Sequence, residues 1–431
     1  MRLKAATLAA FAAPALPLAA LYFPVYVFLP PFYAAERGLS LTFIGAALIA
    51  IRLFDAVSDP AMGLISDRFT TRWGRRRPWL AVGAPVVMAA VAGLFLPPES
   101  AGAVWFTALL FALTLGWTVM LTPYYAWAAE LSTDYAERAR ITVWRDTVGL
   151  VGTIGAAVAF SLGVGSAAGM ANVAALILLT LPVGVFWCLS VVPEPRDHST
   201  AAARPGAIWA TLREEPLFSR LLGAYILNGA ANALPATLFL FFVSDRLGAP
   251  DWGGPLLVLY FGAAVAGAPL WIYGLRFASK HRLWCWAMIY ASAVFACALF
   301  LREGDVLAFA VICVASGLAL GADLALPAAV QADLVDLDTA RSGRQRTGAF
   351  FALWSLATKG ALALAGGAAL LILGQAGFES QAANTPGTLT LLSALYALAP
   401  VLLKLAAIAV MWRFPLDAAR QVEVRCQIEA G

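Results

Sequence analysis

Long apolar runs recur along the whole chain and constrain its fold more than any other feature. A helix needs about 20 consecutive, mostly apolar residues to cross a bilayer. The chain is 61% hydrophobic and only 13% charged, whereas a soluble domain carries roughly 25% charged residues. The sequence therefore predicts an all-α membrane protein with twelve transmembrane helices, at residues 8–34, 40–66, 79–97, 103–130, 145–166, 171–192, 218–243, 253–275, 283–301, 305–330, 347–374 and 388–412.

Basic residues are distributed unevenly between the loops that connect these runs. In membrane proteins Lys and Arg collect in cytoplasmic loops. The odd-numbered loops contain only Arg37, Arg246 and Arg302, whereas the even-numbered loops and both termini are rich in Lys and Arg. We therefore expect both termini in the cytoplasm, which agrees with an even number of spans. The net charge of +4 reflects this bias and does not indicate binding to nucleic acid.

A polar, Pro-containing stretch near the midpoint divides the chain into two similar parts. Arg68-Phe69 has a counterpart 208 residues later at Arg276-Phe277, and the Glu130 region has one 203 residues later around Asp333. Internal repeats of this kind are typical of transporters. The sequence predicts two pseudo-symmetric six-helix bundles with a linker and a tail, divided as 1–193, 194–217, 218–413 and 414–431.

Two carboxylates lie inside the second apolar run, where ionisable residues are costly and mark functional sites. Arg52, Asp55 and Asp59 are spaced so that they share one face of a helix, and Ser58 lies beside them. Carboxylate and hydroxyl oxygens suit a hard monovalent cation, and a close carboxylate pair can instead hold a proton. The alternative is a packing network in which Arg52 only neutralises one Asp.

Two basic residues in the fifth and eleventh runs are candidates for contact with a substrate. Lys359 lies well inside its run, where it can pair with a carboxylate or an anionic substrate group, or else extend toward the membrane surface. Arg145, next to Asp146, opens the fifth run. It can reach a polar substrate group or act as an interfacial anchor paired to Asp146.

Two further charges lie in the second half. We expect Asp323, in the tenth run, to form a hydrogen bond between helices. Lys404, in the twelfth run, is interpreted as a lysine whose ammonium group extends along the helix to the membrane surface.

Charged residues also gather on the basic side of the membrane, in and beside three even-numbered loops. They can form a network that stabilises one conformation, or they can simply determine topology. With Arg52, the predicted network comprises Asp67, Arg72, Arg75, Glu130, Arg138, Asp333 and Asp336.

Three segments resemble the glycoside–pentoside–hexuronide:cation symporters, a family of the major facilitator superfamily. They read RLFDAVSDPAMGLISDRFTTRWGRRRPW at 52–79, TPYYAWAAELSTDYAERARITVWR at 122–145, and ADLVDLD followed by RTGAFFALWSLATKGALALAGG within 332–367. The resemblance covers both halves and implies the major facilitator fold. It also implies symport of an organic solute, sugar or glycoside-like, with Na⁺ or H⁺ by alternating access.

The resemblance also implies functional residues. The cation site, a monovalent metal site if the ion is Na⁺, would consist of Asp55, Ser58, Asp59 and Thr118. Substrate-binding residues would be Tyr26, Tyr125, Arg145 and Lys359.

The chain departs from the family pattern at two positions. Ala19 and Leu121 stand where sugar-binding members carry acidic residues, which disfavours a galactoside. The first run is apolar and aromatic, so an amphipathic or anionic substrate such as a lysophospholipid is the alternative.

Other classes of protein fit the sequence less well. A membrane enzyme is disfavoured because the chain has two His and shows no His cluster, Cys–His pair or phosphate-binding loop. A transporter-like sensor without turnover is a further alternative. We expect no cofactor apart from the coupling ion, and as partners a small-molecule substrate and membrane lipid. A monomer in a bacterial inner membrane is the expected form.

Overall fold

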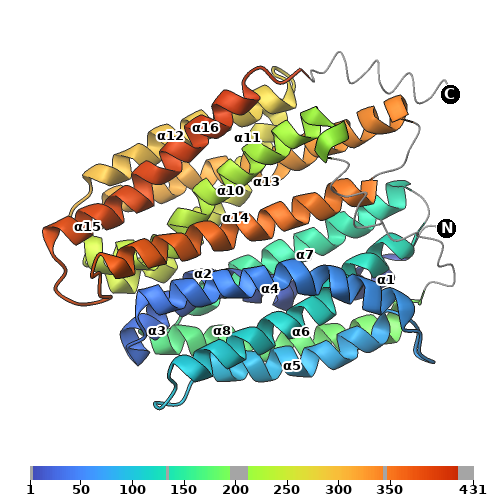
Figure 1. Cartoon of the computed structure of the whole chain (residues 1–431), viewed down its shortest axis with the longest axis horizontal. Helices are drawn as coiled ribbons and strands as arrows, with labels where there is room; N and C mark the ends of the chain where they lie inside the picture. The colour runs from blue at the N-terminus through green and yellow to red at the C-terminus, as the bar shows by residue number, and fades with distance from the viewer. Residues whose placement is uncertain (1–2, 133–134, 195–211, 343–346, 416–431) are drawn as a thin grey trace. The chain divides into compact units, whose positions relative to one another are not determined.

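The twelve predicted helices are present in the computed structural model, which describes residues 3–132, 135–194, 212–342 and 347–415. Twelve helical segments in these residues are long and apolar enough to cross a membrane. The described chain consists of helices (Figure 1): α1 Ala5–Ala12, α2 Ala15–Val27, α3 Leu29–Arg37, α4 Leu41–Arg68, α5 Arg77–Phe95, α6 Ala103–Glu130, α7 Tyr135–Ser161, α8 Ser166–Val191, α10 Pro216–Phe241, η1 Phe242–Arg246, η2 Pro250–Trp252, α11 Gly253–Gly274, α12 Lys280–Ala296, η3 Cys297–Phe300, α13 Val306–Ser342, α14 Thr347–Gln375, α15 Pro386–Ser393, η4 Ala394–Leu398 and α16 Ala399–Met411.

The predicted boundaries differ from the observed ones by a few residues, with three exceptions. The tenth helix continues to Ser342, twelve residues beyond its predicted end at 330. The first run is interrupted, because Pro14 stands between α1 and α2 and a second break separates α2 from α3. Proline has no N–H for the helical ladder and clashes with the preceding turn, so it interrupts a helix. The fifth helix begins at Tyr135, earlier than predicted, so Arg145 does not open it.

The chain divides into two compact units, Met1–Ala201 with Glu379–Gln381, and the remainder. We call the helices α1–α8 the N-unit and α10–α16 the C-unit. In the N-unit, α2 packs against α7 and α8, α4 against α6, and α5 against α6 and α8. In the C-unit, α10 packs against α14 and α16, α11 against α13, and α12 against α13 and α16. Helices at corresponding positions in the two halves therefore form the same packing pairs.

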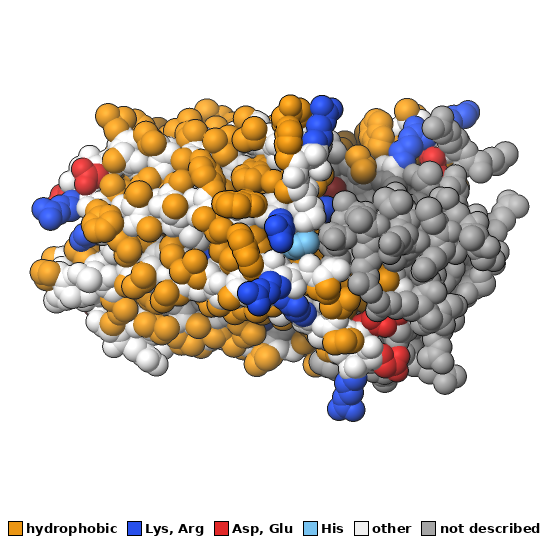
Figure 2. All heavy atoms as spheres, turned by 90° about the horizontal axis from the view of Figure 1, so that it is seen from above, with side chains coloured by type: hydrophobic (Ala, Val, Ile, Leu, Met, Phe, Trp, Pro, Cys, Tyr) orange, Lys and Arg blue, Asp and Glu red, His pale blue; other side chains and the backbone are white. Residues whose placement is uncertain are grey.

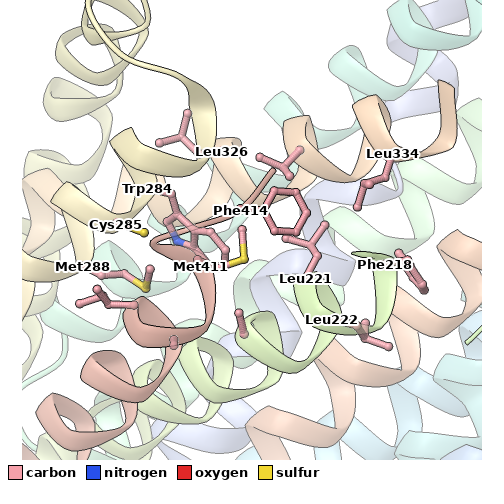
Figure 3. Close-up of a cluster of buried hydrophobic side chains, with 14 of the residues drawn as sticks. Phe218, Leu221, Leu222, Trp284, Cys285, Met288, Leu326, Leu334, Met411 and Phe414 are labelled. Atoms are coloured by element: carbon pink, nitrogen blue, oxygen red, sulfur yellow. The ribbon is translucent and has the colours of Figure 1, made fainter. Parts of the chain in front are cut away.

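Apolar side chains fill the C-unit where α10, α12, α13 and α16 approach one another. Figure 3 shows part of this cluster, in which Leu221 of α10, Trp284 and Met288 of α12, Leu326 of α13 and Met411 of α16 lie close together. Burial of apolar surface of this kind is a general source of packing stability, although lipid reduces its contribution at helix faces.

The outer surface is apolar as well. On the face shown in Figure 2, hydrophobic side chains cover most of the described surface, and the fewer charged side chains lie at its left end and from the middle of the view to the right. Val104, Phe300 and Leu307 are more than three-quarters exposed, at 84%, 80% and 76%. In water such a surface would be unfavourable, so it is suited to lipid.

Candidate cation-binding site

Helix α4 positions the acidic pair within a single long helix. Ser40 caps its N-terminus by accepting a hydrogen bond from the backbone N–H of Phe43. Asp55 and Asp59 are one turn apart and lie on the same side. Pro60 follows directly, and because proline lacks an N–H, the helical bond to the preceding turn is missing beside the carboxylates.

Helix α6 contributes a hydroxyl to the same place. Thr118 donates a hydrogen bond to Asp59 Oδ1 at 2.8 Å, and only 2% of Thr118 is exposed. The Ser58 Oγ atom is buried and has no hydrogen-bond partner among the residues that the structure describes. A buried polar atom without a partner is costly. Thr118 and Asp59 are therefore joined directly, and Asp55 and Ser58 lie within about one turn of Asp59 on α4.

Arg52 supplies a counter-charge on the same helix. It forms an ion pair with Asp55, and both side chains are more than nine-tenths buried, with exposures of 9% and 8%. Its guanidinium also lies over two tyrosine rings of α2, 4.9 Å from the centroid of Tyr26 and 5.9 Å from that of Tyr22. The predicted alternative, in which Arg52 neutralises one Asp, describes this pairing correctly. It does not account for Asp59, Thr118 and Ser58.

Tyr125 and Arg145 meet in the N-unit. The guanidinium of Arg145 lies 4.4 Å from the ring centroid of Tyr125, a cation–π geometry. Arg145 also pairs with Asp146 at 2.8 Å, and the two side chains are 17% and 61% exposed. The prediction that Arg145 opens the fifth helix is wrong, because α7 continues back to Tyr135 and carries this charge inside the span.

Tyr22 lies beside Arg52. Its ring is 5.5 Å from that of Tyr26 and 5.7 Å from that of Trp117. The Arg52 guanidinium lies 5.9 Å from the centroid of the Tyr22 ring. Aromatic side chains of α2 and α6 therefore surround the basic partner of Asp55. Tyr22 was missed from the sequence because the first run has several aromatic residues and no pattern distinguishes them.

Lys359 belongs to the C-unit. It lies inside the span Leu353–Gln375 and is half-buried. The adjacent Thr358 hydrogen-bonds to Tyr225 at 2.9 Å, and Tyr225 stacks on Trp354 at 3.8 Å between ring centroids. This lysine therefore stands beside a polar and aromatic surface of its own unit.

Ala19 and Leu121, the two positions that depart from the family pattern, lie in α2 and α6. Ala19 of α2 faces Gly149 of α7, and a Cβ added to that glycine would lie 3.5 Å from the Ala19 Cβ. One turn away, the Leu16 carbonyl of α2 leaves no room for a Cβ at Gly152. The Ala19 side of α2 is therefore a close helix contact. Leu121 is half-buried in α6.

The predicted charge network forms around a residue that the sequence did not single out. Arg76 is 2% exposed and pairs with both Glu130 and Asp67, while Arg75 also pairs with Glu130. Burial works against the charged form of Arg76, but Glu130 and Asp67 outweigh it and raise the pKa of this guanidinium. Three consecutive arginines gave no basis for choosing Arg76. Arg72, which was chosen, is exposed.

Glu194, which follows α8, adds to these contacts, and the C-unit contains a similar ion pair. Glu194 accepts hydrogen bonds from the backbone N–H groups of Arg75 and Arg76, at 2.5 and 2.7 Å. In the C-unit, Lys280 pairs with Asp333 at 2.7 Å, in the position that Arg76 and Glu130 occupy in the N-unit. The side chains of Arg138 and Asp336 lie outside the described residues.

Lys404 differs from its prediction. It is 6% exposed and pairs with Asp323 Oδ2 at 2.8 Å, so it does not extend to the membrane surface. Asp323 also accepts hydrogen bonds from Asn232 at 3.1 Å and Trp284 at 2.9 Å, which confirms the predicted bond between helices.

This fold, with twelve spans, a repeated helix order and ionisable residues inside the spans of both units, defines a membrane transporter of the major facilitator type. The chain belongs to the family described as MFS/sugar transport protein, which matches residues 10–418.

Several curated relatives are symporters. The inner membrane symporter YicJ of Escherichia coli is 23% identical over 88% of this chain and 84% of its own length. A glucuronide carrier protein homolog of the same organism is 24% identical over 94% and 91%. The human sodium-dependent lysophosphatidylcholine symporter 1 is 24% identical over 88% and 77%. A solved D-xylose–proton symporter, 14% identical, shares the fold with a TM-score of 0.67 over 96% of this chain and 97% of its own.

Proposed function

We propose that this chain is a cation-coupled symporter whose coupling site is formed by Asp55, Ser58, Asp59 and Thr118. The observation that carries the proposal is the pair of carboxylates inside α4, with the Thr118 hydroxyl bound to one of them and the buried Ser58 hydroxyl unsatisfied among the described residues. Charges of this kind inside a membrane span are expensive and are retained for function. The family membership and the relatives named as symporters support the same conclusion.

Coupling follows from competition at Asp55. Arg52 pairs with Asp55 and also rests on Tyr22 and Tyr26, so its guanidinium has a second stabilising contact within reach. A Na⁺ ion or a proton that neutralises Asp55 would release Arg52 from its ion pair and leave it to its contact with these rings. If this rearrangement favours substrate binding, substrate must favour cation binding by the same factor.

The substrate that we propose is a small organic solute, sugar or glycoside-like, and its proposed binding residues are Tyr26, Tyr125, Arg145 and Lys359. Aromatic faces suit the apolar faces of sugar rings, and guanidinium groups suit hydroxyl, carboxylate or phosphate oxygens. The proposed mode of transport is alternating access.

The second candidate is a carrier of an amphipathic anion. Its supporting observation is the apolar side of α2 at Ala19, which packs against Gly149 and carries no carboxylate for sugar hydroxyls. Two relatives of this chain are named for lysophosphatidylcholine and sphingosine-1-phosphate. Uptake assays with a glucuronide and with a lysophospholipid distinguish the candidates.

The orientation in the membrane, the oligomeric state and the role of the charge network are proposals as well. The basic loops favour cytoplasmic termini in a bacterial inner membrane, and the two-unit chain favours a functional monomer. The network around Arg76, Glu130 and Asp67 would stabilise one conformation of the transport cycle.

The decisive experiment for coupling is uptake into proteoliposomes under an imposed Na⁺ or proton gradient. Asp59→Cys removes a carboxylate from the site, and we expect it to lose cation-driven uptake. Asp251→Asn, which removes an exposed carboxylate from η2, is the matched control and is expected to behave as wild type. Normal cation dependence in Asp59→Cys would overturn the assignment.

A further inference from the structure

A second buried charge cluster lies in the C-unit, formed by five side chains of four helices. Lys404 Nζ of α16 donates to Asp323 Oδ2 of α13 at 2.8 Å and to Asn228 Oδ1 of α10 at 2.7 Å. Asp323 also accepts from Asn232 Nδ2 of α10 and from Trp284 Nε1 of α12. Asn228, Trp284, Asp323 and Lys404 are each buried, with exposures between 0% and 9%.

The cluster is closed off from water on at least one side. Trp284 directs its indole N–H to Asp323 and packs its ring among Leu326, Met288 and Met411 (Figure 3). An ion pair buried in such surroundings loses several kcal/mol of hydration per ion, and apolar residues of similar size would be at least as stable. Packing alone therefore does not explain why both charges are present.

The repeat relates this cluster to the cation site of the N-unit. Pro123 in α6 and Pro327 in α13 are 204 residues apart, close to the offset between the two halves. Thr118 precedes the first of these prolines by five residues, and Asp323 precedes the second by four. Asp323 therefore lies at nearly the level in α13 that the hydroxyl of the cation site has in α6.

In the C-unit, the helix that corresponds to α4 packs closely against its neighbour and leaves no space for carboxylates between them. Helix α11, the counterpart of α4, packs directly on α13 through glycines. No Cβ would fit at Gly267, which faces the Leu318 carbonyl, or at Gly317, which faces the Tyr260 carbonyl. The carboxylate of Asp323 accepts its hydrogen bonds from α10, α12 and α16, and the donor on α16 is an ammonium group.

We infer that the C-unit contains a second cation site, whose cation is the ammonium group of Lys404. The ammonium lies between a carboxylate oxygen and an amide oxygen at 2.8 and 2.7 Å, as a bound cation would. Because this ammonium group is covalently attached to the chain, Asp323 remains neutralised without an ion from solution. If the proposed function holds, only the N-unit then exchanges a cation during transport.

Few other titratable groups face the cluster. Tyr260 of α11 interacts electrostatically with Asp323. Within the described contacts, α10 contributes two amides and α12 an indole, none of which titrates. A change in cation or proton binding after loss of Lys404 would therefore be attributable to Asp323, with Tyr260 as the neighbour to check.

The test is to remove the tethered cation and ask whether Na⁺ takes its place. The background is the full chain carrying Asp55→Asn and Asp59→Asn, in which the N-unit site is disabled. Purified protein is melted in NaCl and in choline chloride at equal ionic strength. We expect no Na⁺ response in the background protein and a gain of about 2–4 °C in Na⁺ when Lys404→Met is added. A proton can substitute for Na⁺, so the gain is also measured at lowered pH.

Two variants control the test. Adding Asp323→Asn to Lys404→Met should abolish the gained response, whereas Lys404→Arg should never acquire one. If Lys404→Met does not fold, Asp323→Asn alone provides the second measurement. It leaves the ammonium uncompensated, and its melting temperature should rise with pH relative to the background.

The inference is overturned if Lys404→Met responds to neither Na⁺ nor protons, or if its response survives Asp323→Asn. It is equally overturned if Lys404→Met does not fold and Asp323→Asn has the pH dependence of the background. A background protein that still responds to Na⁺ contradicts the proposed N-unit site instead, so the two failures are distinguishable.

Discussion

The two units carry buried carboxylates in contrasting ways. In the N-unit, Asp55 pairs with an arginine of its own helix that also rests on tyrosine rings, and Asp59 accepts a hydrogen bond from Thr118. In the C-unit, Asp323 accepts from an ammonium, an amide and an indole that three other helices hold in place. In the proposed mechanism the first arrangement exchanges its counter-ion, whereas the second carries a fixed one.

The difference arises from residue size along the same pair of helices in the repeat. The α4–α6 pair accommodates charged side chains, while the α11–α13 pair is brought together by glycines at 267 and 317. A duplicated fold can therefore keep one exchangeable site and close the other. The following predictions test this contrast, from the largest expected effect to the smallest.

Removing one member of the fixed pair should have the largest effect on stability. Lys404→Ala leaves a buried carboxylate without its counter-charge, which costs about 3–5 kcal/mol. Chemical denaturation in detergent measures this loss. The double variant Asp323→Leu Lys404→Met should recover most of it, and equal instability of the single and double variants would show that no charge pairing is involved.

Removing a carboxylate from the exchangeable site should affect transport and leave stability nearly unchanged. A ligand that interacts with a charge contributes about 1.5–3 kcal/mol, so Asp59→Asn should weaken apparent cation affinity by about 10- to 100-fold. Initial uptake rates over a range of Na⁺ concentrations measure the effect. Unchanged affinity in this variant would contradict the assignment of Asp59.

Removing the Arg52 guanidinium, which competes with the cation for Asp55, should increase the apparent cation affinity. In Arg52→Gln, Asp55 loses its internal counter-ion, so apparent cation affinity should increase by about threefold to tenfold, as expected for loss of an ion pair and its stacking. Uptake should nevertheless fall, because substrate and cation are no longer linked through Arg52. Intrinsic tryptophan fluorescence during cation titration provides the affinity.

The smallest predicted effect concerns a single hydroxyl. Ser58→Ala should weaken cation affinity by about twofold to tenfold, the range of one hydrogen-bonding group. Ser292→Ala is the matched control, because Ser292 Oγ of the C-unit is also buried without a hydrogen-bond partner among the described residues. Equal effects of the two substitutions would mean that both hydroxyls act only through packing.

Local patterns in the sequence predicted much of the fold and the centre of the site. Apolar runs predicted all twelve spans, and helical spacing placed Arg52, Asp55 and Asp59 on one face. The break of the first span beside Pro14 was missed because proline is tolerated in membrane helices when neighbours compensate.

What the sequence did not reveal depends on partners that are distant along the chain. Lys404 was interpreted from its own helix, although its acceptors are 176 and 81 residues away. Arg76 could not be distinguished from Arg75 and Arg77 until Glu130 and Asp67 were positioned around it. Charge pairing between helices is therefore the part of the site that requires the structure.

A cation titration of uptake in two variants tests the contrast most directly. Asp59→Asn and the double variant Asp323→Asn Lys404→Met are reconstituted at equal density, and uptake is measured against Na⁺ and proton gradients. We predict that Asp59→Asn needs about 10- to 100-fold more cation for uptake, whereas the double variant keeps the wild-type cation dependence. Wild-type cation dependence in Asp59→Asn together with an altered cation dependence in the double variant would contradict the account.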